Sequence, residues 1–212
     1  MDIVLFGIQG SGKGTLGKIA ADKYGYVIFE TGSELRKLAQ EQNELGKKVK
    51  SIVEAGHLVP NDVVMDIIEN FMAHLPKGKN VLFDGIPRKM VQAETFDDLM
   101  KKLHRDFFGI LVDVPEDVVT RRLMNRRMCE NCKTVYPANY TKDICEKCGG
   151  KLVSRSDDNP ESIRTRINAF FTETMQVIEH YKSQGKLFSM NGNLSIDDAG
   201  KEMLKLLETK LK

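Results

Sequence analysis

A glycine-rich loop near the start of the sequence constrains the fold more than any other feature. The loop GIQGSGKGT covers residues 7–15, follows the apolar run IVLF at residues 3–6, and leads into a helical pattern over residues 15–24. A glycine-rich turn between a strand and a helix leaves backbone N–H groups pointing inward at a helix N-terminus, and such groups bind anions. The sequence therefore predicts a strand, a phosphate-binding loop and a helix in direct succession.

The spacing within this loop matches G-x-x-x-x-G-K at Gly7, Gly12 and Lys13. In that pattern the lysine places a positive charge at the terminal phosphates of a nucleotide. The next residue is Gly14, so the hydroxyl group expected beside the lysine comes one residue later, at Thr15. A turn that binds nothing is the alternative, but the strand before it and the helix after it favour a nucleoside triphosphate as the ligand.

Three further apolar runs predict strands at residues 27–30 (VIFE), 81–85 (VLFDG) and 109–114 (GILVDV), and helical patterns separate them. Unbroken apolar strands that alternate with helices are typical of a parallel sheet covered on both faces. We therefore expect an α/β fold like that of the P-loop nucleoside triphosphate hydrolases. The ligand crevice of such a sheet lies beyond the carboxyl ends of its strands.

Two stretches do not follow this alternation and are predicted to be inserts. Residues 31–59 are mostly polar and helix-rich, whereas residues 127–158 contain all the cysteines and have little apolar periodicity. We expect residues 1–30, 60–126 and 159–212 to form the core domain. The two inserts would then be a small helical unit and a small cysteine-containing unit.

Composition indicates an ordinary globular chain and few partners. The 212 residues are 41% hydrophobic and 29% charged, which suits one main domain with a sizeable core. A net charge of +2 gives no strong field of one sign, so neither nucleic acid nor a membrane is an expected partner. The sequence shows neither a signal-peptide pattern nor a run of ~20 apolar residues, and we expect a cytoplasmic protein.

The cysteines form two C-x-x-C pairs, Cys129 with Cys132 and Cys145 with Cys148. Four thiolates can close a tetrahedral zinc site, although residues 133–144 separate the pairs by less than the usual ~15–20 residues. Disulfides, which are rare in the cytoplasm, and unligated thiols are the alternatives. Iron can occupy the same geometry. We predict a structural zinc ion.

Charged residues at strand ends and in the inserts indicate the chemistry. Asp84 ends an apolar run, where a carboxylate can order the waters around magnesium, although a turn residue or a helix cap is the alternative. Transfer between two polyphosphates must overcome repulsion between anions, and the arginine fork suits phosphate oxygens. Any one arginine alone is more often a solvated surface charge. Seven would need to converge: Arg36, Arg88, Arg122, Arg126, Arg155, Arg164 and Arg166.

Six ordered stretches along the whole chain resemble the adenylate kinase family, in its long form with a zinc-containing lid. They are GIQGSGKGT, TGSELR, GHLVPND, DGIPRKMVQAE, RRLMNRR and RSDDNPESIRTR. In that family the first is the ATP phosphate loop, the second to fourth hold the nucleoside monophosphate, and the last two supply arginines and acids from a mobile lid and its hinge. The resemblance implies reversible, magnesium-dependent phosphoryl transfer from ATP to AMP, giving two ADP, by a monomeric enzyme.

The resemblance also assigns roles to individual residues, and none of them is a covalent nucleophile. The residues implied to bind ATP and its magnesium are Gly10, Ser11, Gly12, Lys13, Gly14, Thr15, Arg122, Arg126, Tyr136 and Asn191. Those implied to bind AMP are Thr31, Gly32, Arg36, His57, Val59, Gly85, Arg88, Gln92, Arg155 and Arg166. The catalytic set would comprise Lys13, Arg88, Arg122, Arg126, Arg155 and Arg166, with Asp157 and Asp158 ordering the arginines and Asp84 supporting the metal.

The sequence departs from the usual family pattern at a few positions. Gln9 stands where proline is common, Leu16 where glutamine is common, and Ile86 and Lys89 lie within the monophosphate motif. None of these changes removes a charged role. The amide of Gln92 would read the adenine edge and favours AMP. Uridine and cytidine monophosphates are the alternative acceptors.

Two other protein classes fit less well. A nucleic-acid-binding ATPase with a zinc ribbon would need a basic, aromatic-rich surface or tandem motor domains, whereas this chain is 7% aromatic and has no tryptophan. A GTP-hydrolysing switch would carry a guanine-reading N-K-x-D segment, which the sequence lacks. Scattered histidines and helical methionines are best explained as surface or core residues: His57, His74, His104, His180, Met65, Met72 and Met100.

Overall fold

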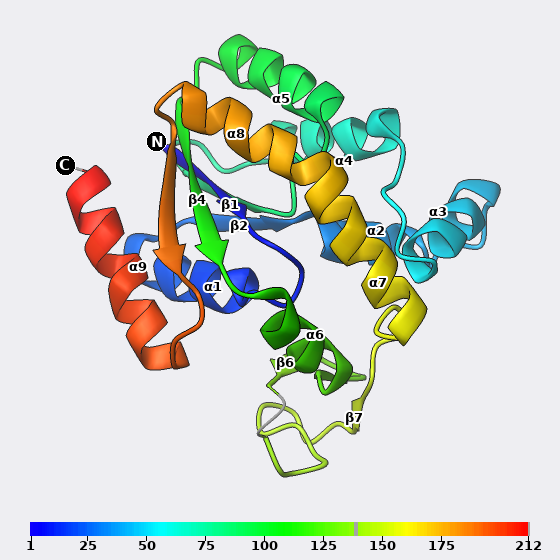
Figure 1. Cartoon of the computed structure of the whole chain (residues 1–212). Coiled ribbons are helices and arrows are strands. Elements are labelled where there is room, and N and C mark those ends of the chain that lie inside the picture. Colours follow the sequence, from blue (N-terminus) through cyan, green and yellow to red (C-terminus); the bar gives the residue numbers. More distant parts are fainter. Residues whose placement is uncertain (138–139, 212) are drawn as a thin grey trace.

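A five-stranded parallel sheet forms the centre of the structure (Figure 1), which is a computed structural model that describes residues 1–137 and 140–211. The spatial order of the strands is β2-β3-β1-β4-β8. Their bounds are β1 Asp2–Phe6, β2 Val27–Glu30, β3 Val81–Asp84, β4 Phe107–Asp113 and β8 Leu187–Asn191. The predicted α/β fold with a parallel sheet is confirmed.

Helices follow the strands in chain order and cover both faces of the sheet. They are α1 Lys13–Tyr24, α2 Thr31–Leu38, α3 Glu44–Glu54, α4 Asn61–Ala73, α5 Met90–Lys102, α6 Glu116–Met124, α7 Pro160–Ala169, α8 Met175–Ser183 and α9 Ile196–Lys210. A π-helical turn, η1 (Phe170–Thr174), joins α7 to α8 in one long rod. None of the described helices has the length and apolar character needed to span a bilayer.

One face of the sheet packs on α1. Gly17 brings the helix close to the strands, because a Cβ atom there would lie 3.0 Å from side-chain atoms of both Leu5 and Leu82. Helix α9 lies beside α1, as Figure 1 shows, and Gly200 allows that approach with a Cβ position 3.1 Å from Ile19. Small residues thus set how closely the two helices approach the sheet and each other.

Aromatic side chains cover the opposite face. Successive residues of a strand point to opposite sides, so Phe6 and Phe83 face away from α1. The Phe6 ring lies 5.7 Å from the ring of Tyr181 on α8, and the Phe83 ring lies 5.1 Å from that of Phe96 on α5. Because β1, β3 and β4 are buried on both faces, they read in the sequence as unbroken apolar runs.

The two stretches predicted as inserts have structures of their own. Residues 31–59 contain α2 and α3. Residues 127–158 contain a small antiparallel sheet in the order β6-β5-β7, formed by β5 (Arg127–Cys129), β6 (Val135–Tyr136) and β7 (Leu152–Val153). This sheet lies at the lower edge of Figure 1, beyond α6 and α7. Its buried apolar residues form a cluster separate from the main core.

Some predicted bounds differ from those observed. Helix α1 begins at Lys13 rather than at Thr15, since the loop turns directly into the helix. Strand β8 was not predicted, because its sequence LFSMN mixes polar and apolar residues and only Met190 is fully buried. It is an edge strand that pairs with β4 alone.

A buried ion pair holds the strand ends opposite the glycine-rich loop. The Asp2 side chain is 1% exposed and accepts hydrogen bonds from Arg105 Nε and Nη2, both at 2.6 Å. It also accepts one from the Val81 backbone N–H at 2.7 Å, which links β1 to β3. One carboxylate therefore joins two strands and the segment that leads into β4.

We predict that Asp2→Ala lowers the free energy of unfolding by about 3 kcal/mol, because it leaves the Val81 N–H and the arginine without their acceptor. The control Asp117→Ala removes an exposed ion pair with Arg121 on α6. This change should alter the free energy of unfolding by less than about 0.5 kcal/mol. Urea denaturation of both variants measures the difference. Equal losses in the two would contradict a structural role for Asp2.

Candidate active site

The glycine-rich loop ends at a helix N-terminus that has no side-chain cap. Gly12 is the N-cap of α1 with φ 97°, a left-handed conformation that favours glycine, and the first turn of the helix contains no acidic residue. The first N–H groups of a helix need acceptors from outside the helix. Their arrangement and the helix dipole favour an anion at this position.

The Lys13 side chain crosses the loop and supplies the positive charge of this part of the site. Its Nζ donates to the carbonyl oxygens of Gly7 at 2.6 Å and Ile8 at 3.0 Å. Burial lowers the pKa of Lys13 to about 8; Asp84 opposes this shift, whereas the nearby Arg88 adds to it. An anion bound here would restore the charged form of the lysine.

Two carboxylates lie beside this loop at the ends of neighbouring strands. Glu30 and Asp84 are in register as the last residues of β2 and β3. A Cβ atom on Gly14 would lie 3.5 Å from Glu30 Oε1 and 3.7 Å from Asp84 Oδ2, so both groups point at the first turn of α1. Burial and the neighbouring Asp84 raise the pKa of Glu30.

Glu30 was not among the predicted site residues. The sequence does carry a signal for it, since VIFE and VLFD both end an apolar strand with an acid. Carboxyl ends of parallel strands meet at one edge of the sheet, so the two acids become neighbours although 54 positions separate them. The sequence analysis named Asp84 from its place at the end of an apolar run and did not apply the same argument to Glu30.

Two buried aspartates collect three arginines at the base of the small sheet. Asp158, with its side chain 1% exposed, accepts from Arg126 at 2.6 and 2.7 Å and from Arg166 at 2.9 Å. Asp157 accepts from Arg155 at 2.6 and 2.9 Å and from Arg166 at 3.3 Å. Arg126 follows α6 and Asp158 precedes α7, so this pair joins the two chain segments that lead into and out of residues 127–158.

Opposing effects act on the pKa of Asp157. Burial alone would raise it, but the ion pairs with Arg155 and Arg166 outweigh burial and hold it below its usual value. The aspartate therefore stays ionised at neutral pH. Helix α7 begins just beyond, where the Asn159 side chain accepts from the Ser162 N–H at 2.9 Å and caps the helix.

Two more arginines approach this cluster from the other side. Burial, together with the positive charge of Arg155, lowers the pKa of Arg36 to about 10. Arg88 donates through Nε to the Gly85 carbonyl oxygen at 2.8 Å, and burial lowers its pKa as well. The η1 turn supports Arg88, because Thr174 donates to its carbonyl oxygen at 3.1 Å. Such π-turns within helices are frequent at functional sites.

Gln92 is buried beside Arg88. Its Oε1 accepts from the Arg88 backbone N–H at 2.9 Å, which holds the amide in one orientation. The Nε2 donors then face away from this contact. Thr31 is also buried, and its hydroxyl has no hydrogen-bond partner among the residues that the structure describes.

Other predicted residues lie farther from the arginine cluster. Arg122 donates to the Ser11 carbonyl oxygen at 3.4 Å, beside the loop. The Tyr136 hydroxyl instead donates to Cys145 Sγ at 3.1 Å, so its polar end is engaged within the small sheet. Among the predicted residues, the side chains exposed to solvent include Thr15, His57, Arg164 and Asn191. Arg164 therefore does not converge with the other arginines on the site.

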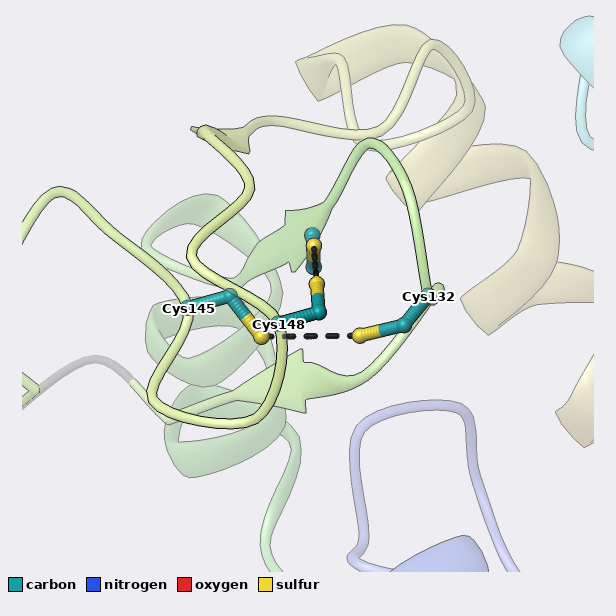
Figure 2. A group of neighbouring side chains, drawn as sticks. Cys132, Cys145 and Cys148 are labelled. Atoms are coloured by element: carbon teal, nitrogen blue, oxygen red, sulfur yellow. Dashed lines mark hydrogen bonds between the residues drawn. The ribbon is translucent and has the colours of Figure 1, made fainter.

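The cysteines form a compact cluster of sulfur atoms. Cys129 Sγ lies 3.4 Å from Cys148 Sγ, the same distance separates the sulfurs of Cys132 and Cys145, and all four atoms lie within 4.8 Å of one another. A disulfide would need about 2.05 Å. A tetrahedral ion with metal–sulfur bonds of ~2.3 Å places its sulfurs about 3.8 Å apart. In Figure 2 the labelled side chains point toward one another, as ligands of one ion must.

Comparison with known proteins identifies the family. A model of the adenylate kinase family matches residues 5–186. The adenylate kinases of Archaeoglobus fulgidus and Thermosipho melanesiensis are 36% and 37% identical to this chain, over 98% of it and 98% and 99% of their own lengths. That of Staphylococcus aureus is 34% identical, over 98% of this chain and 99% of its own length.

The chain belongs to the adenylate kinase family. It is therefore a nucleoside monophosphate kinase, an enzyme that transfers a phosphoryl group. The relatives support the adenylate kinase prediction and not the alternative of a kinase for uridine or cytidine monophosphate. The sequence resemblance at the level of family is confirmed.

We predict that the affinity of the free enzyme for ATP falls as the pH rises through about 8. Lys13 is charged below its pKa, so the attraction to phosphate is present below about pH 8 and is lost above it. The loss should be on the order of 10-fold, as for one charge-assisted hydrogen bond. Calorimetric titration across this pH range measures it. The arginine of Lys13→Arg keeps its charge, so the affinity of this variant for ATP should not fall near pH 8. Identical pH profiles of affinity for the wild type and the variant would contradict the prediction.

Proposed function

We propose that this enzyme catalyses the reversible, magnesium-dependent transfer of a phosphoryl group from ATP to AMP, giving two ADP. The observation that carries the proposal is the convergence of cations from separate parts of the chain. Lys13 lies in the loop, Arg36 on α2, Arg88 after β3, and Arg126 and Arg155 at the base of the small sheet. Phosphoryl transfer requires such positioned charges and no covalent intermediate.

The arrangement separates a donor side from an acceptor side. The first turn of α1 and Lys13 would hold the ATP phosphates, with Arg122 beside the loop. On the other side, Arg36 and Arg88 would hold the AMP phosphate. The transferring phosphoryl group carries negative charge on its oxygens, and this charge would be neutralised by Arg126, Arg155 and Arg166. The two anions could then approach each other without net repulsion.

Glu30, Asp84 and Thr15 fit the magnesium ion that ATP brings. The carboxylates are hard oxygen donors aimed at the start of α1, and burial together with the charge of Asp84 raises the pKa of Glu30. A bound magnesium ion would neutralise charge on the β- and γ-phosphates. We propose that Glu30 shares with Asp84 the task of holding water around this ion.

Gln92 supports AMP as the acceptor. With its oxygen bound to the Arg88 N–H, its amide hydrogens are left to donate to the base. The N1 atom of adenine is an acceptor, whereas the equivalent position of guanine or uracil carries a proton. A base that leaves buried polar groups unpaired is rejected strongly.

We also propose that residues 31–59 and 127–158 are the monophosphate-binding insert and the lid. Each lies between segments of the core, and each presents arginines to the shared site. The cytoplasmic location and the monomeric state expected from the sequence stay predictions.

We predict that AMP exceeds GMP and UMP in kcat/KM by on the order of 10²-fold or more, because the protonated ring nitrogen of guanine or uracil leaves the Gln92 amide unpaired. Coupled assay of ADP formation from ATP with each acceptor measures this. Gln92→Leu should reduce the preference by about 10-fold, whereas Gln184→Leu, an exposed change on the far end of α8, should leave it unchanged. If GMP or UMP equals AMP, the proposed acceptor is wrong; if no acceptor is used, the proposed function is wrong.

We further propose that the four-cysteine cluster binds a structural zinc ion. Its four sulfurs fill a tetrahedral shell and leave no open position for water or substrate. The Tyr136 hydroxyl donates to Cys145 Sγ and accepts from the Glu146 N–H at 3.0 Å, which orients one ligand from outside the shell. The small sheet has few buried apolar residues, so the ion would take the place of a core.

We predict that Cys129→Ser with Cys132→Ser releases the zinc and lowers the melting temperature by about 10 °C, as ~3 kcal/mol does for a chain of this size. Turnover at low temperature should survive in part, because Arg126 and Arg155 lie outside the cluster. Elemental analysis, thermal unfolding and ADP formation are the measurements. Glu130→Ala, an exposed change beside the ligands, is the control. A metal-free wild type would contradict the site, and an equally heat-stable but inactive double variant would contradict its structural role.

A further inference from the structure

A glutamine in the phosphate-binding loop has no role in the site described so far. Gln9 follows Gly7 and Ile8, whose carbonyl oxygens bind Lys13 Nζ. Its side-chain Oε1 is buried and has no hydrogen-bond partner among the residues that the structure describes. A buried polar atom without a partner is uncommon, because it loses its contact with water and gains nothing in return.

Gln9 lines a cavity that lies between the donor and acceptor sides. The loop contributes Gly7, Gln9 and Lys13 to its wall, and the segment after β3 contributes residues 85–88. The η1 turn closes it with Phe170 and Thr174. A group in this cavity therefore contacts both the loop proposed to hold ATP and the arginine proposed to hold AMP.

The NH₂ group of the Gln9 carboxamide is complementary to the acceptor oxygens of a phosphoryl group in this position. A half-turn about the last side-chain bond exchanges its oxygen with its NH₂ group, which offers two donors. A phosphoryl group carries only acceptor oxygens, so it can satisfy those donors. A neutral donor also adds no charge to the cavity, where Lys13 and Arg88 already repel each other.

We propose that Gln9 Nε2 donates a hydrogen bond to the phosphoryl group during its transfer, a proposal that rests on the function proposed above. In the transfer, a bond forms between an AMP phosphate oxygen and the γ-phosphorus of ATP. The bond from that phosphorus to the bridging oxygen breaks, and its electron pair stays with ADP. The amide keeps both protons throughout and contacts only the group that moves. Gln9 is thus a further catalytic residue of this site.

The test uses the full-length, metal-loaded enzyme with Gln9→Ala and Gln9→Glu. We measure kcat, the KM for ATP and for AMP, the affinity for Mg-ADP, and the melting temperature. Mg-ADP lacks the transferred group, so its affinity reports whether the loop is intact. Gln184→Ala, an exposed glutamine on the far end of α8, is the matched control.

Gln9→Ala should lower kcat on the order of 10-fold, with each KM and the Mg-ADP affinity within about threefold of the wild type. Gln9→Glu has the same shape but carries no donor and repels phosphate, so its kcat should fall further. A kcat within about twofold of the wild type in either variant would overturn the proposal and indicate that water fills the cavity. A parallel loss of Mg-ADP affinity and thermal stability in Gln9→Ala, with wild-type turnover in Gln9→Glu, would also overturn it.

These outcomes are separate from a failure of the proposed function. If wild-type enzyme makes no ADP from ATP and AMP, the function itself is wrong. If the wild type is active and the Gln9 variants match it, only the role of Gln9 is wrong. Should Gln9→Ala fail to fold, the isosteric Gln9→Glu variant alone decides the matter, because its kcat either falls or does not.

Discussion

The buried contacts between aspartates and arginines make the active site possible. Five arginines and a lysine point toward one region, and like charges in a partly buried site repel one another. Asp157 and Asp158 offset that repulsion, since each is almost fully buried and each binds two guanidinium groups. The same contacts position the arginine forks, so that substrate phosphates meet charges already held in place.

A parallel sheet supplies the second half of this arrangement. All five strands run in one direction, and their carboxyl ends meet at the edge where α1 begins. At that edge two carboxylates point at the positive end of a helix, and the charge of Asp84 acts on the pKa of Lys13. Positive groups bind phosphate, and the carboxylates suit the cation that accompanies it. The positive groups are close in sequence, whereas the two carboxylates meet only because β2 and β3 pair in register.

The sequence predicted the parts whose causes are local. The loop from Gly7 to Thr15, the buried apolar strands and the paired cysteines each depend on neighbours within a few residues, and all of them are present in the structure. Strand β8 escaped prediction because an edge strand with one buried side needs no unbroken apolar run. The exposed Arg164 was grouped with the site because sequence spacing does not show on which side of α7 it lies.

Residues whose roles depend on distant partners were the hardest to predict. Glu30 becomes important only when β2 and β3 pair in register, and Gln9 only when η1 and the segment after β3 enclose it. The Tyr136 hydroxyl is engaged with Cys145 because the small sheet folds the two together. Long-range contacts of this kind have no periodic signal, so a matching motif gives the residue type without its surroundings.

Helix α7 connects the two segments that are proposed to close over the substrates. At its start, Asp158 binds Arg126 and joins both chain segments at the base of the small sheet. One turn further on, the Ser162 hydroxyl donates to the Glu54 carbonyl oxygen of α3 at 2.6 Å. The helix continues through η1, whose Thr174 supports Arg88. A single rod thus contacts the lid base, the helical insert and the acceptor arginine, so that the positions of all three depend on how this rod packs against the sheet.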